Sequence, residues 1–352
     1  MYDYIVVGFG LSGLCIAEQL EKKERSFLVF EDNSLTSSKV AGGIYNPVIL
    51  KRFTLAWEAD KQLKYAIPFY KALEEKFSTA FLQSFSIHRR FHSVEEQNQW
   101  FEATDKPRLT PFLSPQLVKD LNSNIKNEFS FGKVQQTGAL ATEKLIDTYA
   151  SYLQEKKQLE YSSFDYNQLE LLENSVIYKG IEAKNIIFCD GFNITKNPYF
   201  DYLPIRGNKG EYIIIKSPQL QLKQAVKSSV FIIPLGNDLY KIGATYNHQD
   251  KTQNPTQNAK EKLEKQLSEV VKCDFEVVDQ VAGIRPATKD RRPMLGKHPK
   301  HNSLFVCNGF GSRGVLIAPL ISEQLLNFIE EDIPLSPEID IDRFTKKHFQ
   351  NA

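Results

Sequence analysis

The chain has 352 residues, of which 41% are hydrophobic and 25% are charged, as in an ordinary globular protein. This length predicts about two domains with sizeable cores. Its 44 basic and 43 acidic side chains give a formal net charge of +1, which excludes a global electrostatic field that would recruit nucleic acid or anionic membranes.

Cysteines, histidines and apolar runs exclude further classes. The four cysteines are widely spaced, so neither a zinc site nor a disulfide framework is predicted, and the six histidines form no metal-binding motif. No apolar run reaches the length of a membrane span. The first predicted strand begins near residue 2, which leaves no room for a signal peptide. We therefore expect a cytoplasmic protein without a metal ion.

The first part of the chain predicts a complete β-α-β unit. Residues 4–7 and 27–30 are short apolar runs of the kind found in buried parallel strands. Between them, the sequence GFGLSG at residues 8–13 opens a segment with leucines at helical spacing. Its glycines allow a tight turn, a close approach to a pyrophosphate and close packing of helix on strand, and the helix N-terminus offers free amides to the anion. The alternative is a glycine-rich turn that binds nothing.

An acidic residue closes the second predicted strand. Glu31 follows the glycine turn by about twenty residues, where a carboxylate can bind both hydroxyls of an adenosine ribose. An acid here argues against a 2′-phosphate but does not separate NAD from FAD. The predicted nucleotide-binding residues of this unit are Gly8, Gly10, Leu11, Ser12, Gly13, Glu31 and Asp32.

The next third of the chain predicts mixed elements. Two glycines and an Asn-Pro pair mark a loop at residues 42–47, which is either a plain surface turn or a cofactor contact. Residues 56–77 carry apolar side chains at helical spacing and predict a helix bent near Pro68. Further predicted elements are a strand at 81–92, a helix at 93–103 begun by a Ser cap, an irregular connection at 106–115 and a helix at 140–153.

The remaining chain predicts a second, strand-rich domain. Residues 182–190 form a buried run that suits a return to the nucleotide-binding sheet, whereas residues 204–281 are mostly strand with one helix at 259–271. Such strands suit an antiparallel or mixed sheet. We predict a discontinuous nucleotide-binding domain at 1–80, 132–202 and 283–352, and a substrate-binding domain at 81–131 and 203–282.

A second glycine-rich junction lies near the C-terminus. A strand at residues 304–306 leads into NGFGSRG at residues 308–314, and a helix follows that can contain Pro319 only within its first turn. Arg313 sits beside the helix N-terminus, where the dipole disfavours a cation unless an anion is also present. We therefore predict an anion near Arg313.

The motifs together resemble those of the D-amino acid oxidase family of flavoenzymes, over nearly the whole chain. The segments at 284–290 and 317–319 look like glycine oxidase, whereas those at 43–47, 290–293 and 311–314 look more like the FAD-dependent oxidoreductase domain of the bifunctional tRNA 5-methylaminomethyl-2-thiouridine biosynthesis protein. The motifs are the N-terminal unit, GGIYNP at 42–47, LPIRG at 203–207, IP at 233–234 with IGAT at 242–245, GIRPATKD at 283–290 and GSRGVLIAP at 311–319.

The resemblance implies an α/β fold of the glutathione-reductase-like, Rossmann type that binds FAD, with a second α+β substrate domain built on a mixed or antiparallel sheet. Sarcosine oxidase attaches its flavin through a cysteine close to the position of Gly283, so we expect non-covalent FAD here. The isoalloxazine is expected between the loop at residues 42–43 and the turn at 311–314. Further implied cofactor-binding residues are Gly42, Gly43, Ile44, Gly191, Gly311, Ser312, Arg313, Gly314 and Val315.

The resemblance also implies a substrate site. Arg285 fits the family's carboxylate-binding arginine, since a guanidinium can hold a carboxylate through two parallel bonds; the alternative is a structural ion pair with Asp290 or another carboxylate. Glycine oxidase carries its second substrate arginine one place before Arg313, so Arg313 can instead face the flavin or solvent. Phe231 stands where a tyrosine is expected, which removes a hydroxyl contact. We assign Arg285, Arg313 and Phe231 to the catalytic site.

We therefore predict an FAD-dependent oxidoreductase that oxidises an amino acid or N-substituted glycine by hydride transfer, after which water hydrolyses the imine. One alternative is the oxidative removal of a carboxymethyl group from a modified tRNA wobble uridine, which the near-zero net charge does not favour. Another is a non-catalytic or electron-transfer flavoprotein subunit. The exact substrate, the electron acceptor and the oligomeric state stay open.

Overall fold

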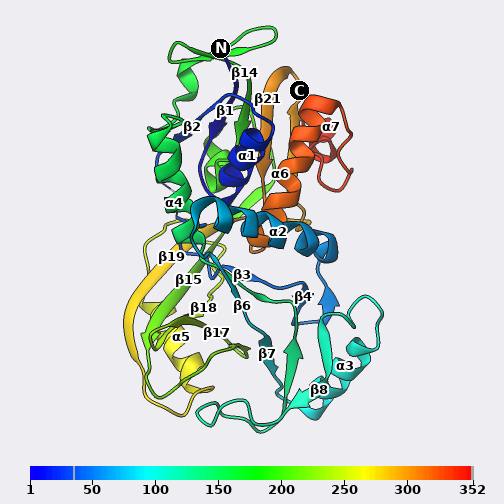
Figure 1. Cartoon of the computed structure of the whole chain (residues 1–352), viewed down its shortest axis with the longest axis vertical. Coiled ribbons are helices and arrows are strands. Elements are labelled where there is room, and N and C mark those ends of the chain that lie inside the picture. Colours follow the sequence, from blue (N-terminus) through cyan, green and yellow to red (C-terminus); the bar gives the residue numbers. More distant parts are fainter. Residues whose placement is uncertain (35, 350–352) are drawn as a thin grey trace.

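Two mixed β-sheets, one in each half of the molecule, carry most of the strands (Figure 1). The computed structural model describes residues 1–34 and 36–349. Figure 1 shows both chain ends in the half that holds the first sheet, and α2 (Ala59–Phe77) lies across the molecule where the two halves meet. No helix in the described part of the chain is both long and apolar enough to cross a membrane.

The first sheet is built around parallel strands. β1 lies between β2 and β14, and β14 also pairs in parallel with β21. Tyr4 and Val6 pack into one buried cluster and Ile5 and Val7 into another, so both faces of β1 are covered and its apolar run is continuous. The strands are β1 (Tyr2–Val7), β2 (Phe27–Glu31), β11 (Leu159–Tyr161), β12 (Leu169–Leu171), β13 (Val176–Tyr178), β14 (Ile181–Phe188), β20 (Met294–His298) and β21 (His301–Asn308).

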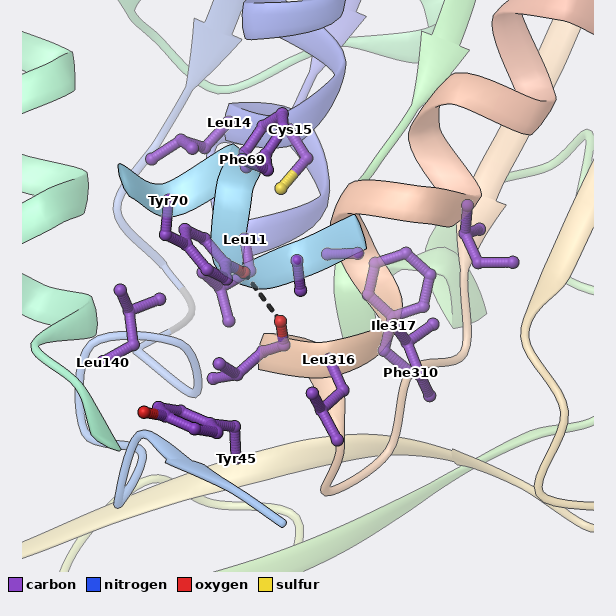
Figure 2. Packing of buried hydrophobic residues seen from close by; sticks show 14 of the residues in the cluster. Leu11, Leu14, Cys15, Tyr45, Phe69, Tyr70, Leu140, Phe310, Leu316 and Ile317 are labelled. Carbon is purple, nitrogen blue, oxygen red and sulfur yellow. Dashed lines mark hydrogen bonds between the residues drawn. The ribbon is translucent and has the colours of Figure 1, made fainter. Parts of the chain in front are cut away.

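Helices cover this sheet and meet beside the glycine turn. The helix α6 packs against both α1 and α2, and α1 also contacts α4. Figure 2 shows side chains of α1, α2 and the start of α6 in one buried cluster. The remaining helices of this half are α1 (Leu11–Lys22), α4 (Thr142–Glu155), α6 (Gly314–Glu331), α7 (Asp342–Phe349) and the 3₁₀ turns η1 (Tyr166–Gln168) and η2 (Gly191–Lys196).

The second sheet has the strand order β19-β15-β18-β17-β16-β7-β9-β8. Its pairs are antiparallel except for β16 with β7, which makes the sheet mixed. Its strands and helices are β7 (Ile87–Arg90), β8 (Leu113–Val118), β9 (Phe131–Val134), β15 (Ile205–Lys216), β16 (Ala225–Lys227), β17 (Phe231–Gly236), β18 (Leu239–Gly243), β19 (Glu276–Thr288), α3 (Val94–Thr104) and α5 (Gln257–Ser268).

Two small sheets complete the fold. β10 pairs with both β3 and β6, and β4 pairs with β5. The strand β3 places Ile44 in the wall of the large cavity described below. The strands are β3 (Ile44–Tyr45), β4 (Val48–Ile49), β5 (Thr54–Leu55), β6 (Leu82–Ser84) and β10 (Gly138–Leu140).

Most predicted elements are present with shifted ends. The predicted Ser93 cap is confirmed, because its hydroxyl accepts a hydrogen bond from the Glu96 amide. The single strand expected at 81–92 is divided into β6 and β7, since each half pairs in a different sheet. The predicted domain boundaries remain a prediction; β9 spans the boundary at 131/132 and β19 the boundary at 282/283, and both pair within the second sheet.

The expectation for Pro319 is wrong, because this proline lies inside α6 beyond the first turn. A proline has no amide hydrogen, so the carbonyl of Val315, four residues earlier, lacks its usual helical donor. The hydroxyl of buried Tyr70 donates to this carbonyl at 2.8 Å instead (Figure 2). A side chain from α2 therefore replaces the missing hydrogen bond of α6.

Replacing Tyr70 with phenylalanine should lower the free energy of unfolding by about 1–3 kcal/mol, because a buried carbonyl loses its donor. In a Pro319→Ala background the new amide at position 319 supplies that donor, so Tyr70→Phe should lower the free energy of unfolding clearly less. The proteins compared are the wild type, the two single variants and the double variant. Urea unfolding of the four variants at saturating FAD measures the coupling. Equal costs in the two backgrounds would show that the Tyr70 hydroxyl does not compensate for Pro319.

Candidate active site

A cavity of about 720 Å³ is lined by residues from both sheets and from the loops between them. Every residue that the sequence analysis assigned to the cofactor or the substrate lines this cavity except Gly13, which packs against Gly8 instead. The structure thus brings the glycine turn after β1 and Arg285 of β19 to one space, although they lie far apart in the sequence.

The turn after β1 has no room for side chains at Gly8 and Gly13. Gly8 has a φ of +94°, and a Cβ there would lie 2.7 Å from the Cys189 carbonyl oxygen. A Cβ at Gly13 would lie 1.9 Å from the Gly8 carbonyl oxygen. These contacts hold the start of α1 directly at the carboxyl ends of β1 and β14, which is where a nucleotide binds in such sheets.

The first turn of α1 offers free backbone donors. The Leu11 amide donates to Ser38 Oγ at 3.2 Å, but no described residue accepts a hydrogen bond from the amides of Ser12 and Gly13. The Ser12 hydroxyl donates to the Cys307 carbonyl at 2.7 Å and ties α1 to β21. Because free amides at a helix N-terminus bind phosphate groups, this end of the cavity fits a diphosphate.

Glu31 lies beside the glycine turn at the end of β2. Its carboxylate accepts hydrogen bonds from the amides of Phe9 and Asn33, the second at 2.6 Å. Burial raises the pKa of this carboxyl group. Its neighbour Asp32 is exposed and also lines the cavity. The acid is therefore placed as a ribose-binding residue requires.

The loop carrying Gly42 and Gly43 is fixed against both halves of the molecule. A Cβ at Gly43 would lie 2.1 Å from the Leu140 carbonyl oxygen, and one at Gly42 would lie 3.0 Å from Ile233 Cδ1. The ammonium group of Lys241 donates to the carbonyls of Val40 and Ala41 at 3.1 and 3.0 Å. The sequence analysis did not identify Lys241, because only the pairing of β18 brings it to this loop.

Two further turns close the cavity. Gly191, after β14, and Gly311, before α6, have φ values of +53° and +58°, which favour glycine. From Gly311 the chain passes through Ser312 and Arg313 to the first turn of α6, where Gly314 and Val315 also line the cavity.

Arg285 stands in the cavity and has no ion-pair partner among the described residues. Its guanidinium lies over Gly210, where a Cβ would come within 2.0 Å of it, and 4.9 Å from the ring centre of Tyr246. It donates only a long hydrogen bond, of 3.4 Å, to the Thr245 carbonyl. No described carboxylate lies within ion-pair distance, and Asp290, the alternative partner, pairs with Arg343 at 3.0 Å. The guanidinium is free to bind an anion.

Arg313 is the N-cap residue of α6, and its guanidinium turns back to the loop before β4. It donates to the Asn46 carbonyl at 2.8 Å, and burial lowers its pKa. The predicted anion near Arg313 is not a carboxylate of the described residues, among which the guanidinium has no ion pair. An anion near Arg313 therefore stays a prediction.

Both acidic and basic side chains line the cavity. Its three acidic residues are Glu31, Asp32 and Asp190; Asp190 lies against Gly8, and burial raises its pKa to about 7. Five basic residues also line the cavity, and one of them, Lys196, belongs to η2, which begins next to Asp190; they are Lys51, Lys196, Lys227 beside half-buried Phe231, Arg285 and Arg313. No local motif marks Asp190 or Lys227, so sequence reasoning missed both. No cluster of metal-binding side chains occurs among the described residues.

Comparisons with known proteins identify relatives of the chain. The chain is 26% identical over 95% of its length to the tRNA 5-methylaminomethyl-2-thiouridine biosynthesis bifunctional protein MnmC of Legionella pneumophila, and it spans about half (55%) of that relative. It is 21% identical to glycine oxidase of Bacillus subtilis, with 93% of each chain covered.

Solved structures show the same fold. Glycine oxidase from Geobacillus kaustophilus matches with a TM-score of 0.78 at 20% identity, covering 98% of both chains. Iminodiacetate oxidase from Chelativorans matches with a TM-score of 0.79 at 16% identity, covering 97% of this chain and 98% of that one. The family model described as FAD dependent oxidoreductase matches residues 3–327. The chain therefore belongs to the D-amino acid oxidase family of FAD-dependent oxidoreductases.

Proposed function

We propose that this FAD-dependent oxidoreductase oxidises an amine that carries a carboxylate, such as an amino acid or an N-substituted glycine. The observation that carries the proposal is the unpaired Arg285 guanidinium in the cavity wall. A buried or half-buried cation without a partner is costly unless a ligand supplies the anion. Relatives whose names describe oxidases of glycine and of iminodiacetate support an amino-carboxylate substrate.

The residues around Gly8 would hold FAD, which supplies a two-electron hydride acceptor when bound. Arg285 holds the substrate carboxylate through paired hydrogen bonds and so fixes the carbon next to nitrogen in one orientation. The three acidic residues of the cavity lie by the glycine turn or its ribose-binding acid, so no carboxylate base stands beside Arg285. An amine that arrives uncharged needs no such base, because its nitrogen lone pair is already free. The carbon loses a hydride, and water then hydrolyses the imine to an amine and a carbonyl compound.

Changing Glu31 to glutamine should raise the dissociation constant for FAD about tenfold or more, because a charged acceptor of ribose hydroxyl groups is lost. The amide keeps an oxygen that can accept from the Phe9 amide, so the glycine turn should stay intact. Flavin fluorescence during titration of the apoprotein measures the constant. Exposed Glu24, changed to glutamine, is the control; an effect of the same size there would remove Glu31 from the proposed cofactor site.

Changing Arg285 to alanine should abolish flavin reduction at substrate concentrations that reduce the wild type. Loss of one partner of a charged pair costs about 2–5 kcal/mol. The measurement is anaerobic mixing of the FAD-bound protein with glycine, sarcosine, proline and D-amino acids while the oxidised flavin band is followed. Bleaching that survives in the variant would place the carboxylate elsewhere. Absence of bleaching with every amine in the wild type would contradict the small-molecule proposal and favour a non-catalytic or tRNA-specific protein.

A second candidate substrate is a tRNA whose wobble uridine carries an N-carboxymethyl group, which is itself an N-substituted glycine. The observation that favours it is a basic rim at the cavity. Lys51 lines the cavity and Arg52 beside it is exposed, while Arg291 lies close enough to affect the pKa of Arg313. Arg292 is not part of this rim, because it pairs with Glu338 at 3.5 Å. Cations of such a rim can follow a nucleic-acid backbone.

If tRNA is the substrate, the carboxymethylated tRNA should bleach the flavin anaerobically, and the same tRNA without that group should bind without bleaching. Changing both Lys51 and Arg52 to alanine should reduce the slope of log affinity against log salt by about 2, since two phosphate contacts are lost. Fluorescence anisotropy of labelled tRNA gives the slope. A slope that does not change in the double variant would exclude this rim from tRNA binding.

A further inference from the structure

Lys227, at the end of β16, is a further half-buried cation in the cavity wall that, like Arg285 and Arg313, has no ion-pair partner among the described residues. Its ammonium group lies 5.3 Å from the ring centre of Phe231. The hydrogen bond that the structure gives it is a marginal one, of 3.5 Å, to the Ser229 carbonyl. No described carboxylate lies within ion-pair distance of it. The charge is therefore poorly compensated by the chain itself.

The surroundings of Lys227 leave it available to a ligand. Arg89 of β7 lies opposite Lys227 of β16 in the strand register. Its guanidinium already forms an ion pair with Glu96 at 2.5 Å. Burial, together with the charge of Arg89, lowers the pKa of Lys227 to about 8. An ammonium group removed from water is costly unless an anion or several acceptors replace the water. A bound anion would supply what the fold does not.

The sheet order separates Lys227 from Arg285. On neighbouring strands, Lys227 lies opposite Phe231, Phe231 opposite Gly243, and Gly243 opposite Tyr212. Residues that lie opposite one another share one face of the sheet, and all four line the cavity. Arg285 lies on the edge strand β19, beyond β15. A ligand held by Arg285 must therefore extend across the sheet face to reach Lys227.

We propose that the natural substrate carries two anionic groups, and that Lys227 binds the second one while Arg285 binds the carboxylate next to the reacting carbon. The substrate is then an N-substituted glycine whose nitrogen substituent ends in a carboxylate or a phosphate. This inference rests on the proposed oxidation of an amino-carboxylate and adds the chemistry of the other end of the molecule. Glycine and sarcosine have only the first group, so they should bind more weakly than the natural substrate.

The test uses thioethers, which have the shape of the amine but no nitrogen to oxidise. The probes are (methylthio)acetate with one carboxylate, thiodiacetate and its homologues with a longer second arm, and (phosphonomethylthio)acetate. Binding to the FAD-bound protein is measured from the change in the visible flavin spectrum. For at least one arm length, the second anion should tighten binding about tenfold or more, as expected of a charged hydrogen bond.

Variants assign this gain to Lys227. The quantity compared is the affinity for a two-anion probe divided by that for (methylthio)acetate. This ratio should fall to near one in Lys227→Met and should be largely retained in Lys227→Arg. Lys223→Met is the matched control, because Lys223 is exposed and lies outside the cavity wall. A ratio near one in the wild type at every arm length, or an unchanged ratio in Lys227→Met, would overturn the inference. A gain only for the phosphonate would identify the second group as a phosphate.

The outcome is distinguishable from failure of the proposed function. Arg285→Ala should weaken both the single-carboxylate and the two-anion probes. If Arg285→Ala weakens the binding of neither kind of probe, the proposed carboxylate site is wrong. The effect of Lys227→Met on the affinity ratio can be measured in that case as well. If Arg285→Ala weakens both and Lys227→Met leaves the ratio unchanged, only the second anionic group is refuted.

Discussion

The close contact between α1 and β1 is the constraint on which the cavity depends. A Cβ at Gly13 would lie only 1.9 Å from the Gly8 carbonyl oxygen. The helix can therefore approach the strand this closely only because Gly13 has no side chain. The contact brings the free amides of the helix to the carboxyl ends of the parallel strands. Gly8 meets Cys189 and Asp190 in the same way, so β14 is fixed at the same point. The nucleotide end of the cavity is thus defined by backbone atoms.

The other end of the cavity is defined by side chains and depends on the second sheet. Gly210 provides the space in which the Arg285 guanidinium lies, and Lys241 binds the carbonyls of the loop that leads to Gly42. The two sheets therefore contribute different chemistry. The first supplies the amides and acids at the glycine turn, and the second supplies Arg285 and Lys227 together with the rings of Tyr212 and Phe231.

Sequence patterns predicted the features that depend on neighbouring residues. The glycine turn, the acid at position 31 and the Ser93 cap involve short spacings, and helical or strand periodicity indicated most elements. Sequence patterns could not predict features that arise from contacts between residues far apart in the chain. Tyr70 completes the hydrogen bonding of α6 at Val315, and Lys227 reaches the cavity only through the pairing of β16 with β17. The role of Arg285 came from a family resemblance, and its lack of a partner required the three-dimensional structure.

Unpaired cations in the cavity wall argue for a function rather than for stability. A fold selected for stability alone would pair Arg285 or Lys227 with a carboxylate or replace them with apolar groups, because a desolvated charge lowers the stability of the folded state. Two other buried or half-buried cations of the same sheet have clear partners: Lys209, which is fully buried, binds Asp250 at 2.6 Å, and Lys241 donates to the carbonyls of Val40 and Ala41. The contrast within one sheet indicates that the open charges are maintained for ligands. Their positions on opposite sides of Phe231 then constrain the length of the ligand as well as its charge.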